Sequence, residues 1–264
     1  MDPRRRLGLI AAACVVAATA RAHAEPTDRD RALVATRIAV EGIGYLVAEF
    51  GLATELAPMH CRWCEPDAFD GAMADALAWR NTNLANAISD ATGYAAAPIA
   101  ASALLVAASW GHGGWRREFD DVSTIVEAAI VTSLVQHVAT LAAARERPYV
   151  YHAIGALPPT ADSNVSFWSG HTSLAFSLAT AAGSVAELRG YALAPAIWAT
   201  GLSLAADTGY LRIAADKHWT TDVLTGAAVG SILGYVWPRY VRRDIHRDLA
   251  LVPTAGGLAL AGTF

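Results

Sequence analysis

The sequence predicts an all-α fold arranged as one helical bundle. Long alanine- and leucine-rich segments recur between clusters of glycine, proline and charged residues, whereas few runs alternate in the manner of strands. Hydrophobic residues make up 54% of the 264 residues and charged residues 17%, so the chain is more apolar than an average soluble protein. This length fits one domain, which we place at residues 25–264.

Residues 1–24 resemble a secretory signal peptide. Three arginines at positions 4–6 precede an apolar run at 7–20, and positions 22–24 have the small-x-small pattern of a cleavage site. The pattern predicts export, with an uncleaved anchor or lipidation at Cys14 as the alternatives. Removal of this segment changes the net charge from −4 to about −7, which gives no basis for a nucleic-acid partner.

Two cysteines follow the first predicted helix. An oxidising compartment favours a disulfide between Cys61 and Cys64. His60 and Asp67 flank the pair, so a metal site is the alternative, although the sequence has no second CxxC pair to complete it. A thioredoxin-like redox role requires a βαβ context that we do not find. We therefore predict a disulfide and no bound metal.

The chain predicts helices near residues 31–56, 70–88, 94–110, 120–144, 171–187, 191–209 and 221–238. The first carries several charged side chains, each of which costs about 2.5 to 3.5 kcal/mol at the centre of a membrane helix, so we place it outside the membrane. The last five are close to the length of a membrane span, which predicts about five spans. The tail after Arg247 has some strand character.

Loop charge indicates the direction of these spans. If the last five helices cross alternately, one side holds Arg116, Arg117, Arg189, Arg239, Arg242, Arg243 and Arg247. The positive-inside rule makes that side cytoplasmic. The mature N-terminus and the cysteine loop then lie outside. We expect an exported inner-membrane protein, with a soluble periplasmic helical protein as the alternative.

Four polar clusters stand at predicted helix ends. They are Arg145-Glu146-Arg147-Pro148, Ser169-Gly170-His171-Thr172, Arg212, and His218 with Asp222 four residues later. In the alternating arrangement, the helix ends that carry these clusters all lie on the same face of the bundle. The clusters are therefore expected to converge on one site.

The converging side chains fit the chemistry of phosphate transfer. Guanidinium groups bind tetrahedral oxyanions, and the free amides of Gly170 and His171 at a helix N-terminus add a positive dipole end. Asp222 would accept from one ring nitrogen of His218 and leave the other free to attack phosphorus. His171 would protonate the leaving alkoxide and later activate water. Because the arginines stabilise the charge, no metal is required.

These residues resemble the tripartite signature of the type-2 phosphatidic acid phosphatase (PAP2) and vanadium haloperoxidase superfamily, which reads K-x6-R-P, P-S-G-H and S-R-x5-H-x3-D. The matching stretches are 140–148, 168–171 and 211–222, and the resemblance covers about residues 90–240. It implies a PAP2-type helical bundle. It also implies that His171 is the acid, that His218 with Asp222 is the nucleophile pair, and that phosphate is held by Arg147, Arg212, Ser169 and Gly170.

Three positions depart from the signature. Thr140 stands where the family has lysine, Trp168 replaces proline, and Leu211 replaces serine. The loss of one cation weakens the predicted phosphate site. Arg145, two residues before Arg147, is our candidate for a replacement.

The sequence thus predicts a metal-independent phosphatase that needs no cofactor. Its expected substrate is a lipid-linked phosphate or diphosphate, with membrane lipid as the partner and the site facing the periplasm. One alternative is a soluble broad-range acid phosphatase, and another is a vanadate-dependent haloperoxidase with the same fold. A non-catalytic membrane or interaction protein is the third alternative, and the three departures are the main argument for it.

Overall fold

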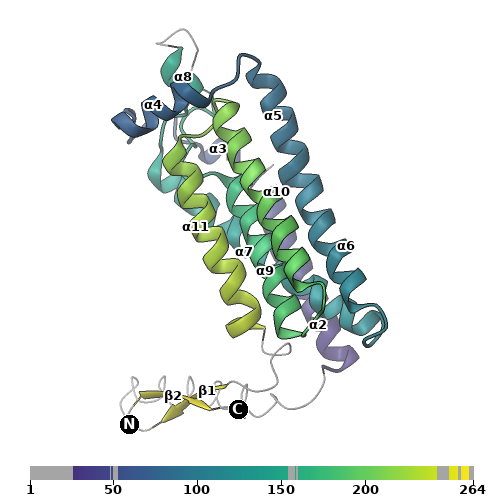
Figure 1. Ribbon diagram of the computed structural model, residues 1–264. Helices are drawn as coiled ribbons and strands as arrows, with labels where there is room; N and C mark the ends of the chain where they lie inside the picture. Colours follow the sequence, from purple (N-terminus) through teal and green to yellow (C-terminus); the bar gives the residue numbers. More distant parts are fainter. Residues whose placement is uncertain are drawn as a thin grey trace, which may run out of the picture.

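The structure is a computed structural model that describes residues 26–47, 49, 53–153, 158, 160–242, 250–254 and 257–261. The predicted signal peptide, Arg243 and Arg247 lie outside these ranges. Within them the chain forms an elongated helical bundle with one small β-hairpin (Figure 1). The predicted all-α bundle is therefore confirmed.

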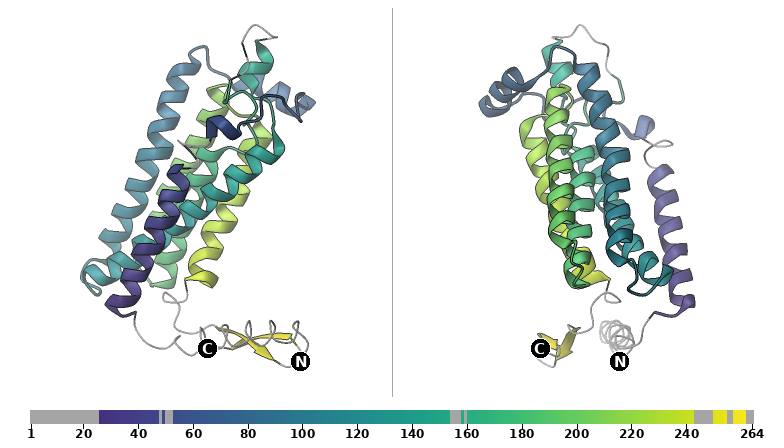
Figure 2. Two further views of the ribbon diagram at one scale, coloured as in Figure 1. Left: turned by 180° about the vertical axis from the view of Figure 1, so that it is seen from behind. Right: turned by 45° about the vertical axis from the view of Figure 1, so that its right-hand side comes forward.

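Long helices run along the bundle, as both views of Figure 2 show. They are α2 (Asp28–Leu46), α5 (Thr82–Ala91) with the π-helical turn η2 (Thr92–Ala96) and α6 (Ala97–Ser109), α7 (Trp115–Ala143), α9 (Gly170–Leu188), α10 (Ala194–Ala214) and α11 (Thr220–Val236). The shorter elements are α3 (Ala53–Leu56), α4 (Ala68–Leu77), α8 (Pro148–His152) and the π-helical turn η3 (Trp237–Val241). Strands β1 (Ala250–Thr254) and β2 (Gly257–Ala261) pair antiparallel.

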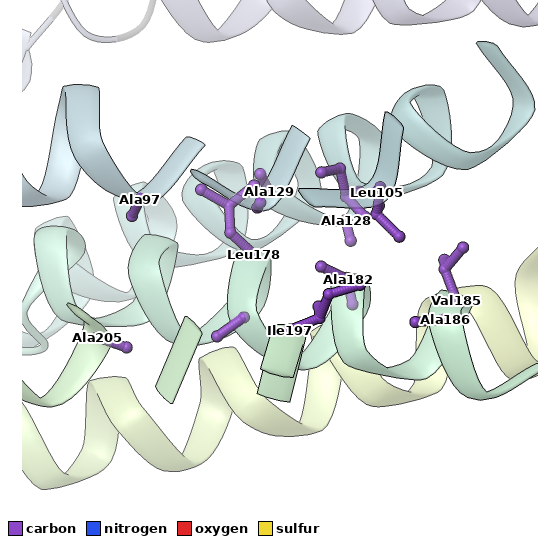
Figure 3. Close-up of a cluster of buried hydrophobic side chains, with 14 of the residues drawn as sticks. Ala97, Leu105, Ala128, Ala129, Leu178, Ala182, Val185, Ala186, Ile197 and Ala205 are labelled. Carbon is purple, nitrogen blue, oxygen red and sulfur yellow. The ribbon is translucent and has the colours of Figure 1, made fainter. Parts of the chain in front are cut away.

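Helix α9 lies at the centre of the bundle, between α7, α10 and α11 (Figure 1). Its inner positions and those of its neighbours are mostly alanine, and Figure 3 shows these short side chains meeting between the helices. Ala181, Ala186 and Ala128 are fully buried. Small residues let helix backbones approach closely, so the alanine-rich composition produces a narrow, tightly packed bundle.

The contact between α9 and α11 is made by the main chain itself. Gly226, Gly230 and Gly234 stand at every fourth position of α11. A Cβ added at these glycines would lie 2.8, 2.3 and 2.3 Å from the carbonyl oxygens of Ser169, Ser173 and Ser177. No side chain fits there, because real Cβ contacts are longer. This glycine row therefore fixes the separation of α9 and α11.

Helix α2 packs lengthwise along α7, as the left view of Figure 2 shows. Arg31 binds both carboxylate oxygens of Asp120, at 2.9 and 2.7 Å, and Arg37 binds Glu127. The placement of this segment outside the membrane stays a prediction. Arg31 and Arg37 are paired within the bundle, which offsets the cost of removing these charges from water.

The two ends of the bundle carry different features. At one end Arg116 pairs with Asp28 at 2.8 Å, so the start of α2 lies beside the start of α7. At the other end Trp63, inside the Cys61–Cys64 disulfide loop, stacks on Arg145. The expectation that the start of the first helix and the cysteine loop share a side is therefore wrong. It failed because α2 runs the length of the bundle.

Helix boundaries differ most from the expectation between residues 77 and 97. The structure ends α4 at Leu77 and begins a new helix at Thr82, where the side chain of Asn81 accepts from the Leu84 amide at 3.0 Å. The predicted break near residues 88–94 is absent, and the helix continues through η2 into α6. Gly93 allows a close approach of neighbouring helices, since an added Cβ would lie 3.2 Å from side-chain atoms of His171 and of Thr208.

Two helical segments among the described residues are long and apolar enough to cross a membrane. They are Thr82–Ser109 and Trp115–Ala143, with mean hydropathies of 1.5 and 1.6 over their most apolar windows. The number of about five spans stays a prediction.

Candidate active site

A cavity of about 390 Å³ opens where α7 and α10 end and α9 begins. Five of the predicted residues line it: Arg147, Gly170, His171, Arg212 and His218. The four sequence clusters therefore converge at one end of the bundle. Ser169, Asp222 and Arg145 lie behind the cavity wall and are almost fully buried.

Local backbone turns bring the clusters to this end. Ala144 ends α7 in the left-handed conformation (φ 48°), and Pro148 occupies the first turn of α8, where its missing N–H costs nothing. Asp216 is also left-handed (φ 57°) and turns the chain after α10. The amides of Lys217 and His218 then bond back to the carbonyl of Arg212, at 3.2 and 3.3 Å. His218 thus stands in a loop before α11.

His218 has one partner on each ring nitrogen. Its Nδ1 lies 2.7 Å from the carbonyl of Ser166, which can only accept, so Nδ1 carries the proton. Nε2 is then unprotonated and accepts from Nη1 of Arg147 at 3.1 Å. Burial, together with the charges of Arg147 and Arg212, holds the pKa of His218 well below its usual value of 6.5. The ring is therefore neutral at physiological pH.

Asp222 is connected to His218 through Ser166. Its Oδ2 is 3.8 Å from Nδ1, too far for a hydrogen bond, so the expected direct pairing on one helix face is not formed. Asp222 instead accepts from the hydroxyl of Ser166 at 2.5 Å and from the amide of Trp219 at 3.0 Å. It therefore caps α11 and fixes the Ser166 carbonyl that orients His218.

Arg145 does not reach the cavity. It donates to Asp222 at 2.5 Å, to Asp70 at 2.6 Å and to the hydroxyl of Thr221 at 2.8 Å, and it is 1% exposed. The ring of Trp63 covers its guanidinium at 3.7 Å. Arg145 therefore holds Asp222 in place and does not supply the missing phosphate cation.

Arg147 faces the cavity and is held by the loop before α9. Its Nε donates to the carbonyl of Asp162 at 2.8 Å, and Nη1 donates to the carbonyl of Lys217 at 2.8 Å. Nη2 pairs with the Asp162 carboxylate at 2.9 Å. Burial raises the pKa of Asp162, but the charges of Arg147 and Lys217 lower it to a value below its usual one. Asp162 is therefore an anion.

His171, at the start of α9, is held by two residues from the helix opposite. Its Nε2 lies 2.8 Å from Oδ1 of Asp90. Its ring packs against Tyr94, with 4.2 Å between the ring centroids. The Asp90 carboxylate favours a proton on this ring, whereas burial and the charges of Arg212 and Arg147 oppose it, so a role as an acid depends on Asp90.

Arg212 is placed by the same helix turn that carries Asp90. Its Nη1 donates to Asn86 at 2.8 Å and to Ser89 at 2.9 Å, and it lies 3.4 Å from Asp90. Its Nε is buried without a partner. The guanidinium lines the cavity, so it remains available to an incoming anion.

Two of the three departures from the signature, Thr140 and Trp168, belong to one hydrogen-bonded cluster. The Thr140 hydroxyl donates to the carbonyl of Phe167 at 2.8 Å. Gln136 donates to the carbonyl of Trp168 at 3.0 Å and to Thr140 at 2.7 Å. These contacts hold the loop that leads into Ser169, whose hydroxyl caps α9. Thr140, which stands at the position of the signature lysine, thus supports the backbone of the loop before α9.

The cysteine loop braces the site from outside. The amide of Glu146 donates to the carbonyl of Trp63 at 3.0 Å, and the Asp67 carboxylate caps α4. Among the described residues, no group of three or more His, Cys, Asp or Glu side chains is placed to hold a metal ion.

Several site residues were not predicted from the sequence. Asp90, Asn86 and Ser89 form a polar face within an otherwise apolar segment, which is a readable signal. The spacing of the motifs gave no indication of Ser166 or Asp162, because their partners lie far away in the chain.

A sequence model of the PAP2 superfamily matches residues 121–245. The chain is 37% identical over 83 residues to a lipid A 1-phosphatase from Porphyromonas gingivalis; the match covers 31% of this chain and only 18% of that protein. The fold of this chain is similar to that of a transmembrane PAP2 type phosphatidylglycerolphosphate phosphatase from Bacillus subtilis, with a TM-score of 0.50 and 16% identity. That match covers 78% of this chain and 96% of the other.

Proposed function

Because residues 121–245 form a domain of the PAP2 superfamily, we propose that the chain is a metal-independent phosphatase that hydrolyses a lipid-linked phosphate through a phosphohistidine. The observation that carries the proposal is the state of His218. Its Nε2 is unprotonated and it lines the cavity together with Arg147, His171 and Arg212. A nucleophile, an acid and two cations therefore share one site.

Binding of the substrate uses groups that are already aligned. The phosphate oxygens accept from Arg147 and Arg212 and from the first amides of α9, which have no partner within the helix. These donors stabilise negative charge on the equatorial oxygens as the reaction proceeds. When Arg147 turns its donors to the phosphate, the lone pair of His218 Nε2 is uncovered.

The first step transfers the phosphoryl group to the enzyme. Nε2 of His218 attacks phosphorus, the phosphorus–oxygen bond to the lipid breaks, and the leaving oxygen takes a proton from His171. The carbonyl of Ser166 keeps its bond to Nδ1 and stabilises the charge that develops on the ring. Asp222 acts through Ser166, so it is a positioning residue.

The second step releases inorganic phosphate. His171, now neutral, takes a proton from a water molecule that attacks phosphorus. The phosphorus–nitrogen bond breaks, and the electron pair returns to His218. His171 is left protonated for the next cycle, with Asp90 beside it.

A lipid-linked substrate fits the surroundings of the site. Beyond the cations, the cavity is lined by Tyr45, Tyr94, Leu141 and Leu174, which offer an apolar wall to an acyl or polyprenyl chain. Both relatives named above are phosphatases of lipid phosphates.

The outer faces of the bundle fit a membrane. Large apolar side chains are exposed there, including Val138 (70%), Ile99 (65%) and Ile232 (59%). Arginines lie at the end opposite the site, and under the positive-inside rule this supports the proposal that the site faces the periplasm. This orientation does not require cleavage after Ala24, because the start of α2 lies at the arginine end.

The decisive experiment measures phosphate release from short-chain phosphatidic acid and from an aryl phosphate, with EDTA present. We expect the wild type to release phosphate and His218→Ala to lose at least about 1,000-fold in rate, because a covalent nucleophile is removed. His112→Ala is the matched control, since His112 is exposed at the other end of the bundle.

Trapping the intermediate tests the mechanism itself. A short reaction with phosphorus-labelled substrate, quenched in base, should leave label on the peptide that contains His218. A folded wild type that releases no phosphate, or a His218→Ala variant as active as the wild type, would refute the proposal.

A further inference from the structure

Lys217 is the only lysine in the chain; the other basic side chains that carry full charge are all arginine. It directly precedes His218 and lines the same cavity. The left-handed residue Asp216 directs this short loop back over the end of α10. A unique residue type at this position calls for a specific explanation.

One carboxylate bridges Lys217 and Arg147. Nζ of Lys217 lies 3.1 Å from Oδ2 of Asp162, and Nη2 of Arg147 lies 2.9 Å from Oδ1. Tyr149 adds its hydroxyl to Oδ2 at 3.1 Å, and its ring packs against Nζ. The Asp162 side chain is 47% exposed. Two cations thus hold a two-oxygen anion at the cavity wall.

No lysine or arginine of α7 lines this cavity. Thr140 occupies the position of the signature lysine, and its hydroxyl is used by the loop carbonyl of Phe167. Arg145 is enclosed by Asp70 and Asp222. A phosphate dianion between Arg147 and Arg212 therefore lacks one expected partner, and among the described residues Lys217 is the remaining lysine or arginine that lines the cavity.

We propose that Lys217 is the third phosphate-binding cation and replaces the absent signature lysine from a different element. In the substrate-free protein, the Asp162 carboxylate then pairs with the cations that bind the phosphate when substrate is present. An incoming phosphate takes over Lys217 and Arg147, and Asp162 moves toward solvent. This inference rests on the proposed function, because it concerns the same site.

The first test compares Lys217→Met with the wild type. Removal of a charge-assisted contact to phosphate should weaken inhibition by orthovanadate and raise KM by about 10- to 100-fold. Lys217→Arg should recover most of the affinity, since it keeps the charge. Arg80→Met is the control, because Arg80 is exposed outside the cavity. Equal vanadate affinity in Lys217→Met and the wild type would overturn the inference.

The second test removes the competing anion. Asp162→Asn keeps the size of the side chain but not its charge, so both cations are freed in the resting protein. We expect this variant to bind orthovanadate more tightly than the wild type. Weaker binding would show that Asp162 positions the cations and would contradict its role as a substitute anion.

The third test uses the uniqueness of Lys217 and does not depend on turnover. An amine-reactive acylating reagent can modify only this side chain and the N-terminal amine, which peptide mapping separates. Inorganic phosphate or orthovanadate should protect Lys217 from modification. Protection in a protein without phosphatase activity would sink the proposed function but keep the inference. Activity without protection would do the reverse.

Discussion

At the scale of single residues, His171, the proposed acid, depends on a helix that the motif does not include. Asp90 contributes one carboxylate oxygen to both His171 and Arg212, at 2.8 and 3.4 Å. Tyr94, one turn later, packs on the His171 ring. The acid and one phosphate cation are therefore positioned by a single turn.

Asp90→Asn tests this coupling. The amide keeps the shape but no longer stabilises a protonated His171, so kcat for alkyl phosphates should fall by about 10- to 100-fold. An aryl phosphate, whose leaving group needs no proton, should be affected much less. The measurement is kcat for both substrates.

Asp75→Asn, on the exposed face of α4, is the control for this prediction. An equal loss on both substrates would mean that Asp90 supports only the fold.

The buried state of His218 predicts a dependence of stability on pH. Its pKa is lowered on folding, so the unfolded chain binds a proton below pH 6.5 that the folded chain does not. The wild type should therefore lose about 1.4 kcal/mol per pH unit from this group as the pH falls below 6.5, until the folded-state pKa is reached. His218→Gln should lack this component.

Thermal unfolding in detergent between pH 7.5 and 5 measures the difference between the two proteins. Parallel pH dependences of the melting temperature would contradict the assignment.

The motif residues could be placed from the sequence because they stand at helix ends with fixed spacing. Several of their partners could not, since Ser166 lies 56 positions from Asp222 and Asp90 lies 81 positions from His171. Only the fold decides that Nδ1 of His218 meets a carbonyl. Lys217 was visible as a unique residue type, but its spacing relative to Arg147 carries no recognisable pattern.

At the scale of elements, the glycine row of α11 sets the position of both histidines. His171 belongs to α9 and His218 precedes α11, so the separation of these helices fixes the separation of the proposed acid and nucleophile. Contacts between main chains have little room to adjust, because backbone atoms cannot change rotamer.

Gly230→Ala should therefore reduce both stability and activity. An added methyl group would lie 2.3 Å from the Ser173 carbonyl oxygen, so the helices must separate, which costs about 1 to 3 kcal/mol. We expect a lower melting temperature and a kcat reduced by at least about tenfold, since small displacements of reacting groups are costly.

Gly44→Ala is the matched control, because nothing lies within 4 Å of the added atom in α2. It should leave activity intact and stabilise the helix by about 0.5 to 1 kcal/mol. A Gly230→Ala variant as stable as Gly44→Ala would remove the argument for the glycine row.

Most helices could be predicted because the apolar segments were separated by clusters of glycine, proline and charged residues. The predicted helix break near Gly93 was wrong. From the sequence alone, a glycine that permits close packing cannot be distinguished from one that ends a helix. The pairing of α2 with α7 could not be predicted, because the proximity of Arg31 to Asp120 and of Arg37 to Glu127 depends on the fold.

At the scale of the whole molecule, the two ends of the bundle differ in charge and in the features that they carry. One end holds the cavity and the disulfide loop. The other holds exposed or paired arginines, including Arg116, Arg189 and Arg239. This asymmetry predicts a single orientation in a membrane.

Single-cysteine labelling measures that orientation. In a background in which the native cysteines are serine, Asp75→Cys marks the cavity end and His112→Cys marks the arginine end; both positions are exposed. A membrane-impermeant maleimide added to spheroplasts should label only Asp75→Cys. Labelling of His112→Cys alone would invert the proposed orientation, and labelling of both would favour a protein outside the membrane.

The glycine row also has an evolutionary consequence. Because main-chain atoms set the distance between the two histidines, substitutions on the outward faces of α9 and α11 leave that distance unchanged. Lineages can therefore adapt those faces to new lipids while the chemistry stays constant. We expect related chains to diverge freely in their outer residues and to remain restricted at Gly226, Gly230 and Gly234.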